Sequence, residues 1–397
     1  MASPRTQRIQ PWLSHLVVAF AVIAAVLWLL PLASPHSVLF PPGPSFEDII
    51  VYKGRFTVYH TMNFFRSRAF SGFAYPPGAA PIYEAFYKTS NPVQTYLILA
   101  AICGGLALAG TWYVLRRAGA GNLFLPIALI LGFPFVFLVQ RANIEIVLWL
   151  LIAIGIFACR QGYNIPAAFL FGIAASVKLY PILLLGFFLR RKRDLPAFLV
   201  GVVTAAVALI VAISYTGPNF LYAARGFFTD VGHFQDHYVD TVGRIEMSFD
   251  HCLFSLFKYW SILHHTSVAS WRTIYYFAAG SFALLLFLRV RTLPFLNRAI
   301  FLTGAMVSLP PVSFTYTLVH LYAPLLFLLG ALATFRSRPP ATAVVALSLI
   351  VFLTLPLISL SVVTPLPAGP IQSCALFALL VISSFQAWPS TPRADAA

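Results

Sequence analysis

Long apolar runs recur from one end of the chain to the other, and short polar or basic segments separate them. Runs of roughly 20 apolar residues predict transmembrane helices, because a helix satisfies its own backbone hydrogen bonds in lipid. The pattern predicts an all-α polytopic membrane protein in which residues 1–397 form one integral membrane domain. We expect about 12 segments, of which about ten cross the membrane fully and two form a short helical hairpin. They are placed at 12–33, 92–115, 123–139, 144–159, 164–176, 180–190, 195–215, 271–290, 299–310, 317–335, 341–363 and 370–388.

The basic residues between these runs predict how the chain is oriented. All of them lie on one side if the N-terminus is cytoplasmic, as the positive-inside rule requires. Two long loops, 34–91 and 216–270, then lie outside the cytoplasmic membrane, and a tail at 389–397 lies inside. Most of the 11 acidic residues fall on the outer side, so we expect polar chemistry on the exterior or periplasmic face. The basic connections contain Arg5, Arg8, Arg116, Arg117, Arg160, Arg190 to Arg193, Arg289, Arg291, Arg298, Arg336 and Arg338.

Composition excludes several other classes of protein. Hydrophobic residues make up 60% of the chain and charged residues only 9%. The net charge of +15 does not indicate nucleic-acid binding, because the cations sit at the ends of apolar runs, where they meet lipid headgroups. The 4 cysteines are scattered, with neither a disulfide framework nor a zinc spacing.

The segments at 164–176 and 180–190 are too short to cross the membrane between two cytoplasmic arginines, so we expect a hairpin that turns back. Pro181 disfavours helix at the residue before it, which places the tip of the hairpin at Val177 to Pro181. Lys178 is thereby held in or near the bilayer, at a cost of about 3 kcal/mol. Such a lysine usually serves a site; the alternative is that its side chain extends to the surface.

The stretch FEDIIVYKGR, residues 46–55, collects charge just after the first apolar run. Its mixed amphipathic pattern predicts a helix at the membrane interface. Asp48 is a candidate general base there, because partial removal from water tunes a carboxylate pKa. The alternative is a solvated surface cluster in which Asp48 pairs with Lys53 or Arg55.

Other polar residues allow two interpretations each. Arg141 either pairs with Glu145, four residues later on a helix, or binds an anionic ligand. His320 is either a hydrogen-bonded interior residue or a ligand, and it shares a helix face with Tyr316. In the second outer loop His233 and His237 have a spacing compatible with metal ligands, but no HExxH signature accompanies them, so no metal is expected. Solvated loop residues are the default interpretation there, and this includes Asp230, Asp250 and His251.

Several short motifs follow one another in a characteristic order. An acidic D-x-x-x-Y, Asp48 to Tyr52, comes after the first helix, and Tyr75-Pro76-Pro77 follows in the same loop. An R-x-N turn, a K-L-Y-P hairpin and a P-x-S-aromatic turn come next, at Arg141 to Asn143, Lys178 to Pro181 and Pro311 to Phe314. In this order and placement the chain resembles glycosyltransferase family 87, GT-C-fold enzymes that use polyprenyl-phosphate mannose.

The resemblance implies an inverting transfer of mannose outside the cytoplasmic membrane, from a polyprenyl-phosphate donor to a hydroxyl of a glycolipid or glycan acceptor. It implies that Asp48 is the catalytic base and that Arg141, Lys178 and His320 bind the donor phosphate. No cofactor or metal is implied, and membrane lipids are the other partners. After the P-x-S-aromatic turn many members carry adjacent histidines, where this chain has Tyr316-Thr317 and then His320. The residues implied to contact substrate are Tyr52, Tyr75, Asn143, Tyr180 and Tyr316.

Two other functions fit a multi-pass membrane protein. A transporter or flippase would place its functional residues near the midplane in two related halves, whereas the charge here collects in the outer loops. A polymerase or ligase acting on polyprenyl-diphosphate-linked glycans would also have polar outer loops. The choice of donor, a polyprenyl-phosphate sugar or a polyprenyl-diphosphate oligosaccharide, separates this enzyme from the mannosyltransferase.

Overall fold

The computed structural model describes residues 19, 22–27, 45–61, 64, 73, 75–117, 132–240, 244–334, 339–357, 366–385 and 388. Over these ranges the chain is helical, and the only β pairing is an isolated bridge between Asp250 and Phe314. The predicted all-α polytopic fold is confirmed. The predicted segment at 12–33, the start of the one at 123–139 and the end of the one at 341–363 lie largely outside the described residues, as does the tail at 389–397.

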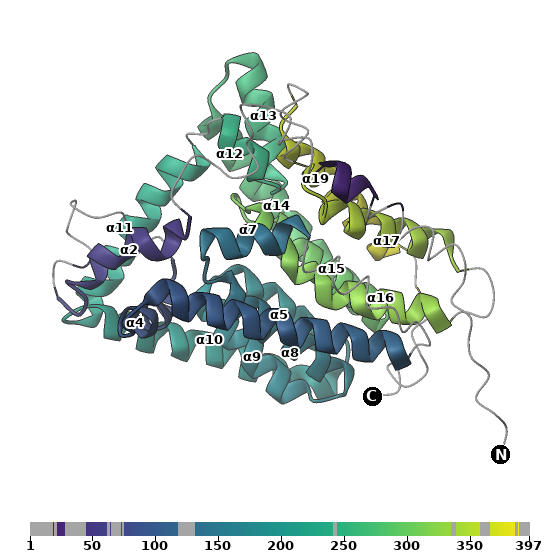
Figure 1. The fold of residues 1–397 in the computed structure, drawn as a ribbon, viewed down its shortest axis with the longest axis horizontal. Coiled ribbons are helices and arrows are strands. Elements are labelled where there is room, and N and C mark those ends of the chain that lie inside the picture. Colours follow the sequence, from purple (N-terminus) through teal and green to yellow (C-terminus); the bar gives the residue numbers. More distant parts are fainter. Residues whose placement is uncertain are drawn as a thin grey trace.

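One layer of the molecule is a set of helices lying side by side, and it is formed by helices between residues 92 and 216 (Figure 1). The helix α9 packs along α10 over most of its length and also contacts α8 and η3. The apolar runs predict these elements well, since each begins and ends within a few residues of its predicted segment. The members are α5 (Pro92–Arg117), α8 (Glu145–Arg160), α9 (Asn164–Val177), η3 (Tyr180–Leu189) and α10 (Leu195–Thr216).

A second group of helices comes from the last third of the chain and packs against the first through η3 and α8. The helix α15 is buried along its whole length, between α19, η3 and η6. The segment predicted at 317–335 is a 3-10 helix, η6, continued by an α-helix, α16. The members are α14 (Val268–Val290), α15 (Phe295–Ser308), η6 (Thr315–Leu321), α16 (Tyr322–Thr334), α17 (Ala341–Leu353) and α19 (Ala368–Phe385).

Among the described residues 5 helices are long and apolar enough to cross a membrane. They are Pro92–Tyr113, Lys192–Thr216, Val268–Val290, Thr315–Leu332 and Ala368–Phe385. Four further apolar helices are shorter, including both arms of the predicted hairpin, α9 and η3. The second arm is a 3-10 helix from Tyr180, and Pro181 near its start accounts for the break that leaves Lys178 extended between the two arms.

Both predicted outer loops are folded. The region 34–91 contains α2 (Glu47–Phe56), η2 (Pro77–Ala79) and α4 (Ala80–Tyr87). The region 216–270 contains α11 (Phe220–Phe234), the π-helix η5 (Gln235–Val239), α12 (Arg244–Phe249) and α13 (Phe254–His264). A small apolar cluster of Val239, Cys252, Phe254 and Tyr275 holds the second region together.

The default interpretation of the second region as solvated was wrong for several of its charged residues. Asp230, Asp250 and His251 are all buried, and each contacts polar groups from other parts of the chain. Asp230 accepts a hydrogen bond from the backbone N–H of Phe73 at 3.1 Å and faces Arg55 at 3.7 Å. This pair joins the region 34–91 to the region 216–270.

The two ends of the first helix layer differ in charge. The helix α8 begins at Glu145 and ends at Arg160, while η3 begins at Tyr180 and runs to Leu189, next to Arg190. The short connections Arg160 and 190–193 therefore lie at the end away from Glu145 and Lys178. A hollow lined by Arg190, Arg191 and Arg298 opens at that basic end, and no predicted site residue lines it.

Two glycines allow α9 and α10 to approach closely. A Cβ atom built on Gly172 would lie 2.6 Å from the carbonyl oxygen of Gly201, and one built on Gly201 would lie 3.1 Å from that of Ala168. Small residues at such crossings let membrane helices pack through van der Waals contacts. Gly105, on the exposed side of α5, has no atom within 4 Å of the same position.

We expect Gly172→Ala to destabilise the protein by about 1–3 kcal/mol, because the added methyl group meets backbone that cannot move aside. Gly105→Ala is the matched control, and it should leave stability unchanged or raise it, since alanine favours helix over glycine. Thermal unfolding of the two purified variants in one detergent measures the difference. Equal melting temperatures would mean that the close α9–α10 contact does not limit stability.

Candidate functional site

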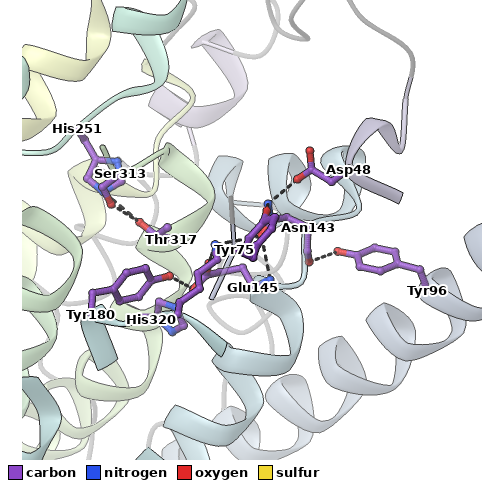
Figure 2. Close-up of polar contacts among 11 residues, drawn as sticks. Asp48, Tyr75, Tyr96, Asn143, Glu145, Tyr180, His251, Ser313, Thr317 and His320 are labelled. Atoms are coloured by element: carbon purple, nitrogen blue, oxygen red, sulfur yellow. Dashed lines mark hydrogen bonds and ion pairs between the residues drawn. The ribbon is translucent and has the colours of Figure 1, made fainter. Parts of the chain in front are cut away.

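Charged and amide side chains from four parts of the chain meet beside the break in the hairpin. They come from α2, from the turn between α7 (Phe133–Arg141) and α8, from the link between α9 and η3, and from η6. Figure 2 shows Asp48, Asn143, Glu145 and His320 converging from these elements. We call this group the polar cluster: Glu47, Asp48, Arg141, Asn143, Glu145, Lys178, Tyr180 and His320.

Asp48 lies at the start of α2 and is mostly buried. Its Oδ1 accepts a hydrogen bond from Arg141 at 2.7 Å, and its Oδ2 accepts one from the amide of Asn143. Burial raises the pKa of the Asp48 carboxyl, while Arg141 and Asn143 oppose that shift. The alternative of a solvated surface cluster, in which Asp48 pairs with Lys53 or Arg55, was therefore wrong. Asp48 contacts residues of the turn between α7 and α8, and Arg55 contacts Asp230.

Asn143 connects the two halves of the polar cluster and is fully buried. Its Nδ2 donates to Asp48 and, at 2.8 Å, to the hydroxyl of Tyr75. Its Oδ1 accepts from the backbone N–H of Glu145 at 3.0 Å and lies 3.4 Å from the amine of Lys178. The hydroxyl of Tyr96 donates to the backbone oxygen of Asn143 and holds the turn in place.

The turn itself separates Arg141 from Glu145. Ala142 adopts a left-handed conformation, with φ of 53°, and ends α7. The two residues consequently do not lie one turn apart on a single helix, and the alternative in which Arg141 pairs with Glu145 was wrong. Arg141 instead contacts both Glu47 and Asp48.

Glu145 is the acid that sequence reasoning did not place in the site. Its side chain is fully buried at the start of α8, where it accepts hydrogen bonds from Lys178 and Tyr180 and contacts Nε2 of His320 at 2.6 Å. An acid buried at the start of an apolar helix needs such partners, because an unpaired charge there is costly. The signal available in the sequence was an acidic residue directly before a long apolar run, which predicts a buried partner for it.

Lys178 is enclosed by aromatic rings as well as by Glu145. Its amine lies 5.2 Å from the ring centre of Tyr75, 5.3 Å from that of Tyr316 and 5.9 Å from that of Tyr180. Cation–π attraction adds to the ion pair in fixing the amine. The side chain is 11% exposed, so the alternative that it extends to the surface was wrong.

The remaining predicted residues line the same space. Tyr52 packs edge to face on Tyr75, with ring centres 5.7 Å apart, on the α2 side. Tyr316 and His320 both reach the cluster from η6, which is a 3-10 helix and not the α-helix expected. Nδ1 of His320 is buried and has no hydrogen-bond partner among the described residues.

A second buried polar group lies against the start of η6. Asp250 pairs with Lys258 at 2.6 Å and accepts a hydrogen bond from the backbone N–H of Ser313 at 3.0 Å. His251 lies 3.2 Å from the hydroxyls of both Ser313 and Thr317, and burial lowers its pKa to about 4, so it is neutral near pH 7. Lys258, which lies within the largely apolar helix α13, was not among the predicted site residues.

Within the described part of the chain no group of His, Cys, Asp and Glu side chains has the arrangement of a metal site. His233 lies on α11 and His237 on η5, and both are exposed.

The fold and the polar cluster describe a polytopic membrane protein with an acid–base group buried at one end of its helices. The sequence model of glycosyltransferase family 87 matches residues 73–309, well over half of the chain. The chain belongs to glycosyltransferase family 87, and this sets the transporter interpretation aside. No match was found among curated proteins. Tyr75, Arg141, Asn143, Glu145, Lys178 and Tyr180 lie inside the matched range, and the tertiary structure adds Asp48, Tyr52, Tyr316 and His320 to them.

We expect Glu145→Gln to lower the stability of the protein by about 3 kcal/mol, because it leaves Lys178 buried without its partner. Adding Lys178→Met should recover most of the loss, since an apolar side chain then fills the same volume. Thermal unfolding of both single variants and the double variant measures this coupling. If the effects of the single variants simply add, the contact between Glu145 and Lys178 contributes nothing to folding.

Proposed function

We propose that the protein transfers a hexose, mannose, from a polyprenyl-phosphate donor to a hydroxyl of a glycolipid or glycan acceptor at the outer face of the cytoplasmic membrane. The observation that carries this proposal is the placement of Asp48. It is a mostly buried carboxylate held by Arg141 and Asn143, in a cluster that also contains Lys178 and His320. An activated lipid-phosphate sugar needs a base on one side of the sugar and cations on the other, and the cluster contains both.

In the proposed step Asp48 takes the proton of the acceptor hydroxyl while that oxygen attacks the anomeric carbon of the donor. The bond from the anomeric carbon to the phosphate oxygen breaks, and the configuration at carbon inverts. The lipid phosphate leaves with the bonding electrons and its negative charge increases. Burial raises the pKa of Asp48, which makes it a stronger base than a solvated aspartate.

Arg141 is the cation most accessible to the donor phosphate. Its side chain and that of Glu47 are partly exposed, at 25% and 31%, whereas Lys178 and Glu145 are enclosed. The phosphate would displace Glu47 from Arg141 and bring its charge near Lys178. His320 would contact the phosphate only through Nδ1, because its Nε2 already contacts the Glu145 carboxylate. Tyr52, Tyr75, Asn143, Tyr180 and Tyr316 would line the space for the sugar.

The outer-face orientation rests on the charges at the two ends of the helices. The basic connections Arg160 and 190–193 lie at the end opposite the polar cluster, and the positive-inside rule places that end in the cytoplasm. The apolar residues Leu221 and Phe228 are exposed on α11, as on a helix lying at a membrane surface. The polar cluster would then face the exterior.

We expect Asp48→Asn to reduce transfer at least about 100-fold, the contribution of a general base, while the protein still inserts and folds. Glu47→Gln is the matched control, since Glu47 precedes Asp48 on α2 and shares Arg141 with it; this variant should keep most of its activity. The assay uses reconstituted protein, radiolabelled polyprenyl-phosphate mannose and a total lipid extract as acceptor. Full turnover in Asp48→Asn would exclude Asp48 as the base. Transfer only from a polyprenyl-diphosphate oligosaccharide would favour a polymerase or ligase.

The pH dependence of transfer provides a separate test of Asp48. The base must be deprotonated, so kcat/KM should fall as the pH drops through the raised pKa of Asp48, above the value of about 3.9 for a free aspartate. Arg141→Gln removes a charge that lowers this pKa, so the acid limb should move to higher pH. Lys53→Gln, on the exposed side of α2, should leave the limb in place. If kcat/KM of Arg141→Gln falls at the same pH as in the wild type, the group that must be deprotonated is not Asp48.

A further inference from the structure

A row of three aromatic rings leads from the outer surface into the polar cluster. Tyr238 on η5 is 39% exposed, Phe314 is half-buried, and Tyr316 is 8% exposed. The ring centres of Tyr238 and Phe314 are 6.5 Å apart, and those of Phe314 and Tyr316 are 6.0 Å apart. Tyr316 ends the row, with its ring centre 5.3 Å from the amine of Lys178.

The outer two rings form a corner. The planes of Tyr238 and Phe314 meet at 83°, so the face of one ring stands beside the edge of the other. A flat ligand can lie on one face and touch the second ring with its edge. Burial raises the pKa of the Tyr238 hydroxyl, and the negative charge of Asp48 raises it further. This agrees with a short distance between the two rings and the proposed base.

The backbone, and not the two rings themselves, holds the corner in place. Lys258, buried against Asp250, lies 3.4 Å from the carbonyl oxygen of Tyr238. Asp250 also accepts from the N–H of Ser313 at 3.0 Å and forms the isolated β bridge to Phe314. The same buried ion pair thus positions both residues through main-chain contacts. Truncating either ring should leave the fold intact.

We propose that Tyr238 and Phe314 form the binding site for a pyranose ring of the acceptor; this rests on the transferase activity proposed above. The carbon-bound hydrogens on one face of a pyranose suit the electron-rich face of an aromatic ring. The surroundings are polar, with Asp236 and His237 exposed beside Tyr238, which suits a hydroxylated ring better than a polyprenyl tail. From this corner an acceptor hydroxyl would face the polar cluster that contains Asp48, where the row ends beside Lys178.

The acceptor site is tested by kinetics with octyl α-D-mannoside as the probe acceptor. Tyr238→Ala should raise the KM for this acceptor about tenfold, the effect of losing one aromatic stacking contact, with the donor KM unchanged. Tyr238→Phe should stay near the wild-type value, because stacking needs the ring and not the hydroxyl. Tyr163→Ala, at an exposed tyrosine at the basic end of the helices, is the control and should change neither KM. A raised donor KM in Tyr238→Ala would assign the row to the polyprenyl tail and overturn the proposal.

A binding measurement without any donor keeps this test separate from the transfer reaction. Saturation-transfer NMR with methyl α-D-mannoside should show contact with wild type and with Tyr238→Phe. The signal should be lost in the double variant Tyr238→Ala, Phe314→Ala. An equal signal in the double variant would refute the site even if transfer is intact. Conversely, if wild type binds the sugar through these rings but does not use polyprenyl-phosphate mannose, the donor proposal fails and the acceptor site stands.

Discussion

A lysine buried at the break between two membrane helices is the constraint on which the rest of the site depends. Lys178 cannot remain charged in that place without a partner, and Glu145 at the start of α8 supplies it. That start is set by the turn at Ala142 and Asn143, and Asn143 in turn reaches across to Asp48 on α2. Each residue of the polar cluster is therefore positioned by the need to satisfy the charge or the polar group next to it.

The pairing of charges also decides how an anionic ligand can enter. Carboxylates already pair with the basic side chains: Glu145 contacts Lys178 and His320, and Glu47 and Asp48 contact Arg141. The Glu145 pair is enclosed, so exchanging it for a phosphate would strand a buried acid. The pair of Arg141 with Glu47 is partly exposed, so Glu47 can return to water at little cost. In the proposed reaction this difference would make Arg141 the first contact of the donor phosphate and give Lys178 a long-range electrostatic role.

Helix positions could be predicted well because apolar length alone determines which segments cross a membrane. The hairpin break could be predicted too, because Pro181 restricts the backbone locally. The pairing of Arg141 could not, since it depends on the left-handed conformation of Ala142, which no glycine in the sequence indicates. The burial of Asp250 and His251 was hidden for a different reason: tertiary packing brings them to their partners Lys258, Ser313 and Thr317, and no local pattern in the sequence indicates those contacts.

The sequence by itself determined the all-helical membrane architecture, the separation of basic and acidic ends, and the short list of residues around Asp48 and Lys178. The first two features follow from local composition, because lipid excludes water and charge; the list of residues followed from the resemblance to glycosyltransferase family 87. Only the tertiary structure decided which acid pairs with which base, and it alone brought Tyr238, Phe314 and Tyr316 into one row. Contacts of this kind join residues far apart in the chain, and the folding of the regions between the long helices sets their geometry.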